Sequence, residues 1–314
     1  MDPLAMSAIP PMQNRIIPTD RLALFAFSVC LLFAAFYQPL LSLVRFASSN
    51  DLNSHILLIP FVSAYLAWLN RNTLPSSSSP NRLLGLIAFA FSGAVLICYR
   101  YVANADVAVN DQLTWQILAF VGCVLGVCLM CMGRATVKAL AFPLGLLLFT
   151  VPLPSSAVAV IESFFQHTSA TAAAVMFKFA GTPFFRDQTY FQLPGINLQV
   201  APECSGIRSS IALFITSIVA GKLFLNSPYL RILFSLAVIP LSIFRNGVRI
   251  FTIGELCVHI GPHMIDSPIH HRGGPLFFAF SLIPFAILLL LLAKFERNKR
   301  AVNAAPAEPI AHAH

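Results

Sequence analysis

Residues 275–294 read PLFFAFSLIPFAILLLLLAK, with no acidic side chain and one basic side chain, Lys294, at the end. A helix that spans a bilayer needs about 20 consecutive apolar residues, because each residue adds about 1.5 Å along the helix axis. This stretch meets that length, and a basic cluster continues from it at Arg297, Lys299 and Arg300. The stretch therefore predicts a transmembrane helix that ends at a charged boundary with water.

The rest of the chain has the same character. Its 314 residues are 57% hydrophobic and only 10% charged, whereas soluble domains contain roughly 25% charged residues. So few charges cannot cover a soluble surface, and so apolar a chain must bury its side chains rather than remain disordered. The composition therefore predicts an all-α polytopic membrane protein, with the lipid bilayer as its solvent.

Eight apolar runs are candidates for transmembrane helices. They are residues 22–44, 54–70, 83–100, 112–133, 138–153, 207–226, 231–256 and 275–294. We expect one transmembrane domain over residues 21–295, preceded by a disordered cytoplasmic tail at 1–20 and followed by a basic, then flexible, cytoplasmic tail at 296–314.

The charges orient these helices. Lys and Arg residues precede the first run and follow the second, fourth, sixth and eighth runs, which lie on one side if every run crosses the membrane. The opposite loops contain Asp51, Asp106, Asp111, Asp187, Glu203 and Asp266. Because positively charged loops stay in the cytoplasm, we expect both termini there. The net charge of +8 then reflects topology, and we expect no nucleic-acid partner.

The largest segment on the outer side, residues 154–206, has two parts. Residues 156–180 have apolar positions at helical spacing with polar residues between them, which predicts an interfacial or half-inserted helix. The apolar period then changes to two in residues 189–193 and 196–200, on either side of Pro194-Gly195. This pattern predicts a small β-hairpin on the outer surface.

Cys204 is the candidate nucleophile. It follows the predicted hairpin and directly precedes the helix expected from about residue 205. A thiol at a helix N-terminus lies near unpaired N–H groups and the positive end of the helix dipole, and both favour the reactive thiolate. The alternative is a small buried residue at a strand–helix junction. Most other cysteines lie inside apolar runs, where Cys behaves as a small hydrophobic residue.

Four arginines predict a cationic site on the outer side. Arg245 and Arg249 lie four residues apart, so they share one face of the helix over residues 231–256. An arginine within the membrane is costly unless it pairs or lines an aqueous cavity, which makes it a functional candidate. The alternative is snorkelling of these side chains to the outer headgroups. With Arg208 and Arg272, the group would suit a carboxylate or an oxyanion.

Histidines cluster on the same side, and they allow three interpretations. They are His259, His263, His270 and His271, with Asp266 among them. His259 and His263 have metal-ligand spacing on a helix, although Gly261-Pro262 argues against a continuous helix there. Alternatively, one imidazole serves a cysteine as general acid or base. The third interpretation is that they are solvated loop residues.

Together these motifs resemble the exosortases, in the exosortase/archaeosortase family of membrane cysteine transpeptidases. The resemblance covers about residues 50–290, and the order and spacing of its motifs make it specific. The similar segments are Ser54–Pro60, Val151–Pro154, the CSGIR stretch at Cys204–Arg208, Asn246–Arg249, and His270 with Gly273-Gly274.

The resemblance implies a cysteine protease or transpeptidase that cleaves secreted proteins at a C-terminal sorting tag. Such a tag has a short motif, often Pro-Glu-Pro, then a spanning helix and a basic cluster. Cys204 would form an acyl-thioester, Arg249 matches the catalytic arginine and His270 the third member. The resemblance also implies the cell inner membrane, with the site on the outer side. We expect neither a cofactor nor a metal.

Arg249 has two candidate roles, which the sequence does not separate: it could bind the oxyanion or protonate the leaving group. A guanidinium is a strong oxyanion donor but, with its very high pKa, a poor acid, so we favour His270 for proton transfer. Arg208, Arg245, His271 and Arg272 are candidates for substrate binding.

Two other functions stay open. The first is an anion-binding membrane transporter, for which Cys204→Ala would leave activity intact and Arg249→Ala would remove it. The second is an intramembrane metallopeptidase that uses His259, His263 and Asp266 within the 259–271 cluster, and that would be sensitive to chelators.

Overall fold

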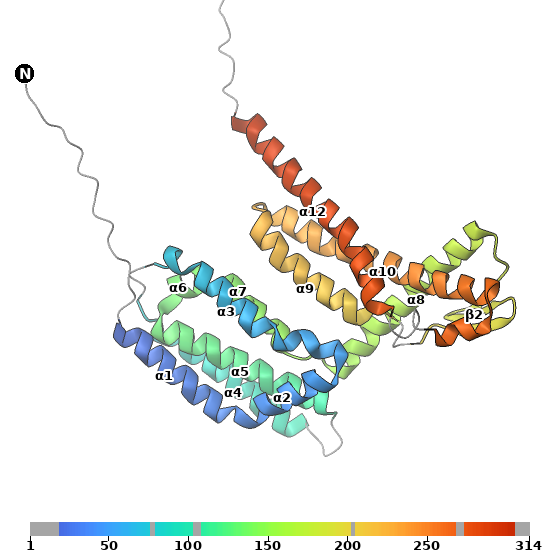
Figure 1. The fold of residues 1–314 in the computed structure, drawn as a ribbon. Helices are drawn as coiled ribbons and strands as arrows, with labels where there is room; N and C mark the ends of the chain where they lie inside the picture. The colour runs from blue at the N-terminus through green and yellow to red at the C-terminus, as the bar shows by residue number, and fades with distance from the viewer. Residues whose placement is uncertain (1–18, 76–78, 103–107, 202–204, 268–272, 305–314) are drawn as a thin grey trace, which may run out of the picture. The chain divides into compact units, whose positions relative to one another are not determined.

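The computed structural model describes residues 19–75, 79–102, 108–201, 205–267 and 273–304 (Figure 1). The fold is mostly helical, with one small antiparallel sheet. The chain forms two compact units, Met1–Ser155 and Ser156–His314. Each unit is described by itself.

The first unit is helical throughout its described residues, and its core forms around α5. Leu113, Ile117 and Val121 on α5 are buried against Leu43 of α2 and Ile56 of η1. The elements are α1 (Thr19–Ala35), α2 (Tyr37–Ser49), η1 (Asp51–Leu57), α3 (Ile59–Leu69), η2 (Arg71–Thr73), α4 (Arg82–Val102), α5 (Val109–Cys131), α6 (Gly133–Ala139), α7 (Ala141–Leu146) and η3 (Leu147–Thr150).

The second unit contains long helices and the sheet. In it α10 packs against both α9 and α12. The elements are α8 (Ser155–Ala180), β1 (Phe185–Asp187), β2 (Tyr190–Leu193), β3 (Ile196–Gln199), α9 (Ile207–Phe224), α10 (Pro228–His259), η5 (Pro262–Asp266) and α12 (Gly274–Ala304).

The predicted polytopic helical membrane fold is confirmed. Six helical segments are long and apolar enough to cross a membrane, and up to eight are if two bent helix pairs each count as one span. The eight predicted runs correspond to α1 with α2, η1 with α3, α4, α5, α6 with α7, α9, α10 and α12. The helix α8 is not among the candidate spans, so its interfacial position remains a prediction.

Prolines explain where the two bent pairs break. The helices of each pair meet at 71°. A proline has no N–H for the carbonyl four residues earlier and collides with that carbonyl, so a helix can end there. The helix α1 ends at Ala35, four residues before Pro39, and α6 ends at Ala139, four residues before Pro143.

The predicted hairpin is present and has a third strand. Strands β2 and β3 pair antiparallel, with Leu193 opposite Ile196 across Pro194-Gly195. Gly195 has φ +82°, which suits the position after proline in a tight turn. Strand β1 extends the sheet in the order β1-β2-β3. With only three residues, two of them charged, β1 carries little apolar pattern to predict it.

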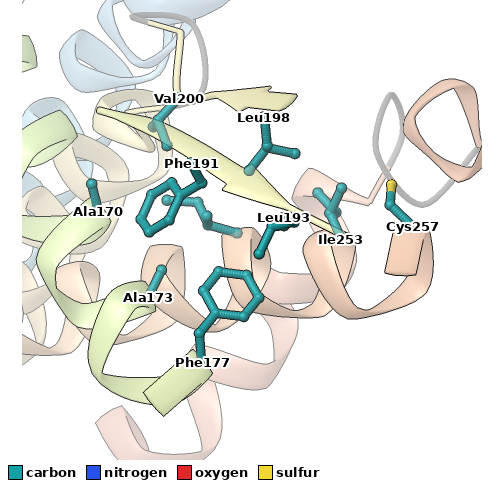
Figure 2. Packing of buried hydrophobic residues seen from close by; sticks show 10 residues of the cluster. Ala170, Ala173, Phe177, Phe191, Leu193, Leu198, Val200, Ile253 and Cys257 are labelled. Atoms are coloured by element: carbon teal, nitrogen blue, oxygen red, sulfur yellow. The ribbon is translucent and has the colours of Figure 1, made fainter. Parts of the chain in front are cut away.

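One face of the sheet is buried against α8 and α10 (Figure 2). The cluster contains Ala170, Ala173, Phe177, Phe191, Leu193, Leu198, Val200, Ile250, Ile253 and Cys257. Two glycines of α10 bring it close to α8. A Cβ on Gly247 would lie 2.8 Å from Cβ of Ala172, and a Cβ on Gly254 would lie 2.4 Å from the Phe177 ring. The sheet is therefore held in place by tight contacts on α10.

Candidate functional site

The segment that carries Cys204 is held at its first end by the residue before β2 and by α8. The backbone N–H of Val200 donates a hydrogen bond to the Thr189 carbonyl, with an N···O distance of 3.0 Å. The side-chain amide of Gln166, on α8, donates to the Val200 carbonyl. Val200 is buried as well. The chain therefore leaves the sheet from a fixed position, four residues before Cys204.

At its second end the segment is held by α10 through Gly206. The φ of Gly206 is +76°, a conformation that residues with a Cβ rarely adopt. A Cβ there would also lie 3.0 Å from Oδ1 of Asn246, a buried residue of α10. Glycine is required at this position both by its backbone conformation and by the close approach of α10.

Arg245 makes the polar part of this second anchor. Its Nη2 donates to the Gly206 carbonyl at 3.1 Å and to Oγ of Ser210, on α9, at 3.3 Å. Ser210 Oγ also donates to the Gly206 carbonyl, at 2.8 Å. Only 6% of Arg245 is exposed, and its buried Nη1 has no hydrogen-bond partner among the described residues. Arg245 therefore contacts the chain two residues beyond Cys204.

Arg249, one turn further along α10, lies on a small cavity. Residues in and beside β3 and in η5 line it as well, and its volume is about 40 Å³. The lining residues are Leu198, Gln199, Val200, Arg249, Ile250, Ile253 and Ile265. Arg249 thus lines a mainly apolar cavity beside the strand that leads to Cys204.

The structure separates the candidate arginines into different settings. Arg245 is buried, Arg249 is partly buried at the cavity, and Arg208, on the first turn of α9, is exposed. Arg208 does not line the cavity described above. Arg245 and Arg249 share one side of α10, as their spacing predicted, but they contact different parts of the unit.

The acidic and histidine residues at the end of α10 form a different set of contacts. Glu255 accepts a hydrogen bond from Oγ1 of Thr182 at 2.5 Å, and its other oxygen lies 2.9 Å from Nε2 of His259. His263 and Asp266, on η5, are exposed. Across the described ranges, no three His, Cys, Asp or Glu residues are grouped as metal ligands would be. His259 therefore pairs with Glu255 instead of joining His263 and Asp266.

Four of the predicted site residues lie outside the described residues. These are Cys204, His270, His271 and Arg272. The structure does describe the residues that flank them, namely Ala201 and Ser205 around the cysteine segment and Ser267 and Gly273 around the histidine segment.

Sequence reasoning missed the residues that position the site. Gln166 was one of several polar residues on an amphipathic helix, and only the fold shows that it reaches the Val200 carbonyl. Gln199 is a polar residue at an alternate position of a strand, and Ile265 is an apolar residue of a short loop helix. None of the three has a local pattern that distinguishes it, because each acts through a contact that is distant in sequence.

The comparisons with known proteins give one match. The family model described as transmembrane exosortase (Exosortase_EpsH) matches residues 43–287. Neither the comparison with curated proteins nor the comparison with solved structures found a match. The matched region leaves out most of the first bent pair and the second half of the last candidate span, and it includes the other candidate spans, the whole of the sheet and the Arg249 cavity. The chain therefore belongs to the transmembrane exosortase family.

Proposed function

We propose that this protein is a membrane cysteine transpeptidase that cleaves secreted proteins at a C-terminal sorting tag. The observation that carries the proposal is the arrangement around residues 200–206, in a chain that belongs to the exosortase family. The segment is held at Val200 and at Gly206, and the Arg249 cavity lies beside the strand that leads into it. Covalent catalysis requires a nucleophile that is held in position, and the proposal places Cys204 between these two fixed ends.

The proposed reaction begins with attack of the Cys204 thiolate on the carbonyl carbon of the scissile peptide bond. A sulfur–carbon bond forms, the carbonyl oxygen becomes an oxyanion, and collapse of this intermediate breaks the carbon–nitrogen bond. The leaving amine takes a proton, and the secreted protein remains attached to Cys204 as a thioester. An amine or water then attacks the thioester carbonyl and releases the thiolate.

We assign the oxyanion to Arg249 and the proton to His270. A guanidinium is permanently charged, so it stabilises an oxyanion well and releases a proton poorly. The partly apolar lining of the Arg249 cavity supports this assignment, because a hydrogen-bond donor is more effective where water is excluded. Imidazole is the side chain whose ordinary pKa lies closest to neutrality, so we assign proton transfer to the amine to His270.

The test is co-expression with a secreted protein that carries a Pro-Glu-Pro motif, a spanning helix and a basic cluster. We expect wild-type enzyme to shorten this protein and Cys204→Ala to leave it at full length. Sensitivity of cleavage to chelators, with Cys204→Ala still active, would favour a metallopeptidase instead. If the Cys204→Ala variant transported an anion and the Arg249→Ala variant did not, a transporter would be favoured.

A further inference from the structure

The hydrogen-bond pattern of the sheet shows which groups of β3 face away from β2. In an antiparallel pair, directly opposed residues alternate between those that exchange two hydrogen bonds and those that exchange none. The Val200 N–H bonds to Thr189, and Leu198 and Ile196 lie two and four residues before Val200 on the same strand. These positions therefore bond to β2. The N–H and C=O groups of Asn197 and Gln199 must point to the opposite edge.

This edge of β3 has free hydrogen-bonding capacity. Within the part of the chain that the structure describes, no hydrogen bond joins the outward backbone groups of Asn197 or Gln199 to another element. Both residues are exposed, whereas Leu198 between them is buried. β3 is the last strand of the sheet order, and it has no proline or charged residue. Such an edge is a template for another strand.

The opposite edge of the sheet differs. By the same alternation, the outward backbone groups of β1 are those of Arg186. Its side chain folds over the sheet, donating to the Gln188 carbonyl at 2.6 Å and to Oγ1 of Thr171 at 3.1 Å. A charged residue on an edge strand opposes pairing with a further strand. Among the described residues, the sheet is thus protected on its β1 side and has no partner strand on its β3 side.

We infer that the outer edge of β3 binds the tag of the substrate as an added β-strand, which rests on the proposed function. Strand addition uses backbone hydrogen bonds for affinity and side-chain pockets for specificity. Asn197 and Gln199 supply two N–H donors and two C=O acceptors to the incoming strand. Gln199 and Arg249 line the same cavity, so the bound strand runs close to Arg249.

The position of the edge fits the cleavage step. Cys204 follows Gln199 by five residues, a reach of at most about 18 Å of extended chain. The proposed Pro-Glu-Pro motif is compatible with strand addition as well. In an added strand, the backbone N–H and C=O groups of every second residue point toward β3. The backbone of the glutamate can therefore bond to the edge, while the backbone groups of the two prolines, which lack an N–H, point away.

The first experiment removes a single edge donor. Gln199→Pro deletes the outward N–H but no hydrogen bond to β2, and proline is tolerated on an edge strand when its nitrogen faces outward. Gln199→Ala is the matched reference, because it shortens the side chain and keeps the N–H. We expect the kcat/KM for processing of the tagged protein to be about tenfold or more lower in Gln199→Pro than in Gln199→Ala, since a partner carbonyl loses its donor.

Two controls accompany this pair. The first control compares Arg186→Pro with Arg186→Ala on the β1 edge, where we expect no strand to bind. The kcat/KM values of these two variants should be equal. The rate at which iodoacetamide alkylates Cys204, followed by mass spectrometry of the peptide that contains it, should be the same in Gln199→Pro and Gln199→Ala. Equal processing by the two Gln199 variants would overturn the inference.

A second experiment detects the strand directly. In a Cys204→Ala background, Asn197→Cys is oxidised with a series of tagged proteins that each contain one cysteine, placed along the tag. Directly opposed side chains of paired strands lie within disulfide distance, so one tag position should cross-link strongly and its two neighbours weakly. Cross-linking at no position, or equally at all positions, would refute strand addition. Processing by Cys204→Ala itself would instead refute the proposed function.

Discussion

At the scale of single residues, the structure gives two arginines of α10 different surroundings. Arg245 donates to the chain at Gly206, and Arg249 lies on a cavity beside β3. The two lie four residues apart on one candidate span, so their sequence context is nearly the same. Only the fold separates the arginine that contacts the chain near Cys204 from the arginine that lines a cavity.

Arg249→Lys should be nearly inactive. Lysine keeps the positive charge but loses the planar, multi-donor fork of the guanidinium. Removal of one oxyanion donor typically lowers kcat about 10²–10³-fold, so we expect Arg249→Lys to fall within about tenfold of Arg249→Ala. The measurement is the rate at which the tagged protein is shortened. Near-normal processing by Arg249→Lys would show that charge alone is sufficient.

Arg245→Ala should lower kcat more than it changes KM. The substitution removes the charged donor to the Gly206 carbonyl, so we expect Cys204 to be presented less accurately to the substrate. The alkylation rate of Cys204 by iodoacetamide should change in the same variant, because this rate reports the thiol without any substrate. Ser210→Ala removes an uncharged donor to the same carbonyl and should show a smaller effect of the same kind, because a hydrogen bond from a charged group is stronger. A rise in KM alone would instead indicate that Arg245 binds the substrate.

At the scale of elements, glycine brings α10 against α8. We expect Gly254→Val to destabilise the protein by about 1–3 kcal/mol, because overpacking a tight core has this cost. The Phe177 ring and Leu193 occupy the space that the new side chain needs. The measurement is thermal or denaturant unfolding of the purified protein in detergent.

The matched control is Gly93→Ala on α4. A Cβ at Gly93 would have no heavy atom within 4 Å, so this substitution should be neutral or stabilise the helix by up to about 1 kcal/mol. Equal stability of Gly254→Val and wild type would mean that α8 and α10 are not in close contact at this point.

The elements also show how far a sequence can predict this fold. Long apolar runs identify the candidate spans because the bilayer sets their length. The breaks before Pro39 and Pro143 follow from proline chemistry, yet Pro240 and Pro284 lie inside the continuous helices α10 and α12. A proline therefore marks a possible break, and tertiary contacts decide whether the helix ends there.

The residue types of the candidate site remain a prediction from the sequence, and its geometry could not be predicted. Cysteine, arginine and histidine identify the chemistry because few other residues supply a nucleophile, an oxyanion donor and a proton carrier. The contacts that hold residues 200–206, from Gln166 and Arg245, link positions 34 and 39 residues apart. No local pattern encodes such contacts.

At the scale of the whole molecule, the number of crossings sets the side on which each segment lies. With eight crossings both termini lie on one side of the membrane. If both bent pairs enter and leave through the same face, six crossings remain and the termini again lie on one side. If only one bent pair does so, seven crossings remain and the termini lie on opposite sides.

We expect reporter fusions within residues 75–80 and after Arg300 to be cytoplasmic. This follows from the basic residues that flank these positions. Fusions within 182–200 and 262–267 should lie on the outer side, where we place the active site. The measurement uses two enzyme reporters at each position, one active only in the cytoplasm and one active only outside it. The reporter that is active shows the side on which the position lies. A terminus on the outer side would contradict the proposed site.

The two anchors around Cys204 have a consequence for insertional mutagenesis. Residues 201–205 are the only ones between Val200 and Gly206. Lengthening a connection by one residue costs little loop-closure entropy, but it adds up to about 3.4 Å of chain, and a misplacement of about 1 Å can already slow catalysis greatly. In a library of single-residue insertions, proteins with an insertion between the anchors should accumulate normally in the membrane and fail to process substrate. Proteins with an insertion beyond Arg300 should accumulate normally and process substrate normally.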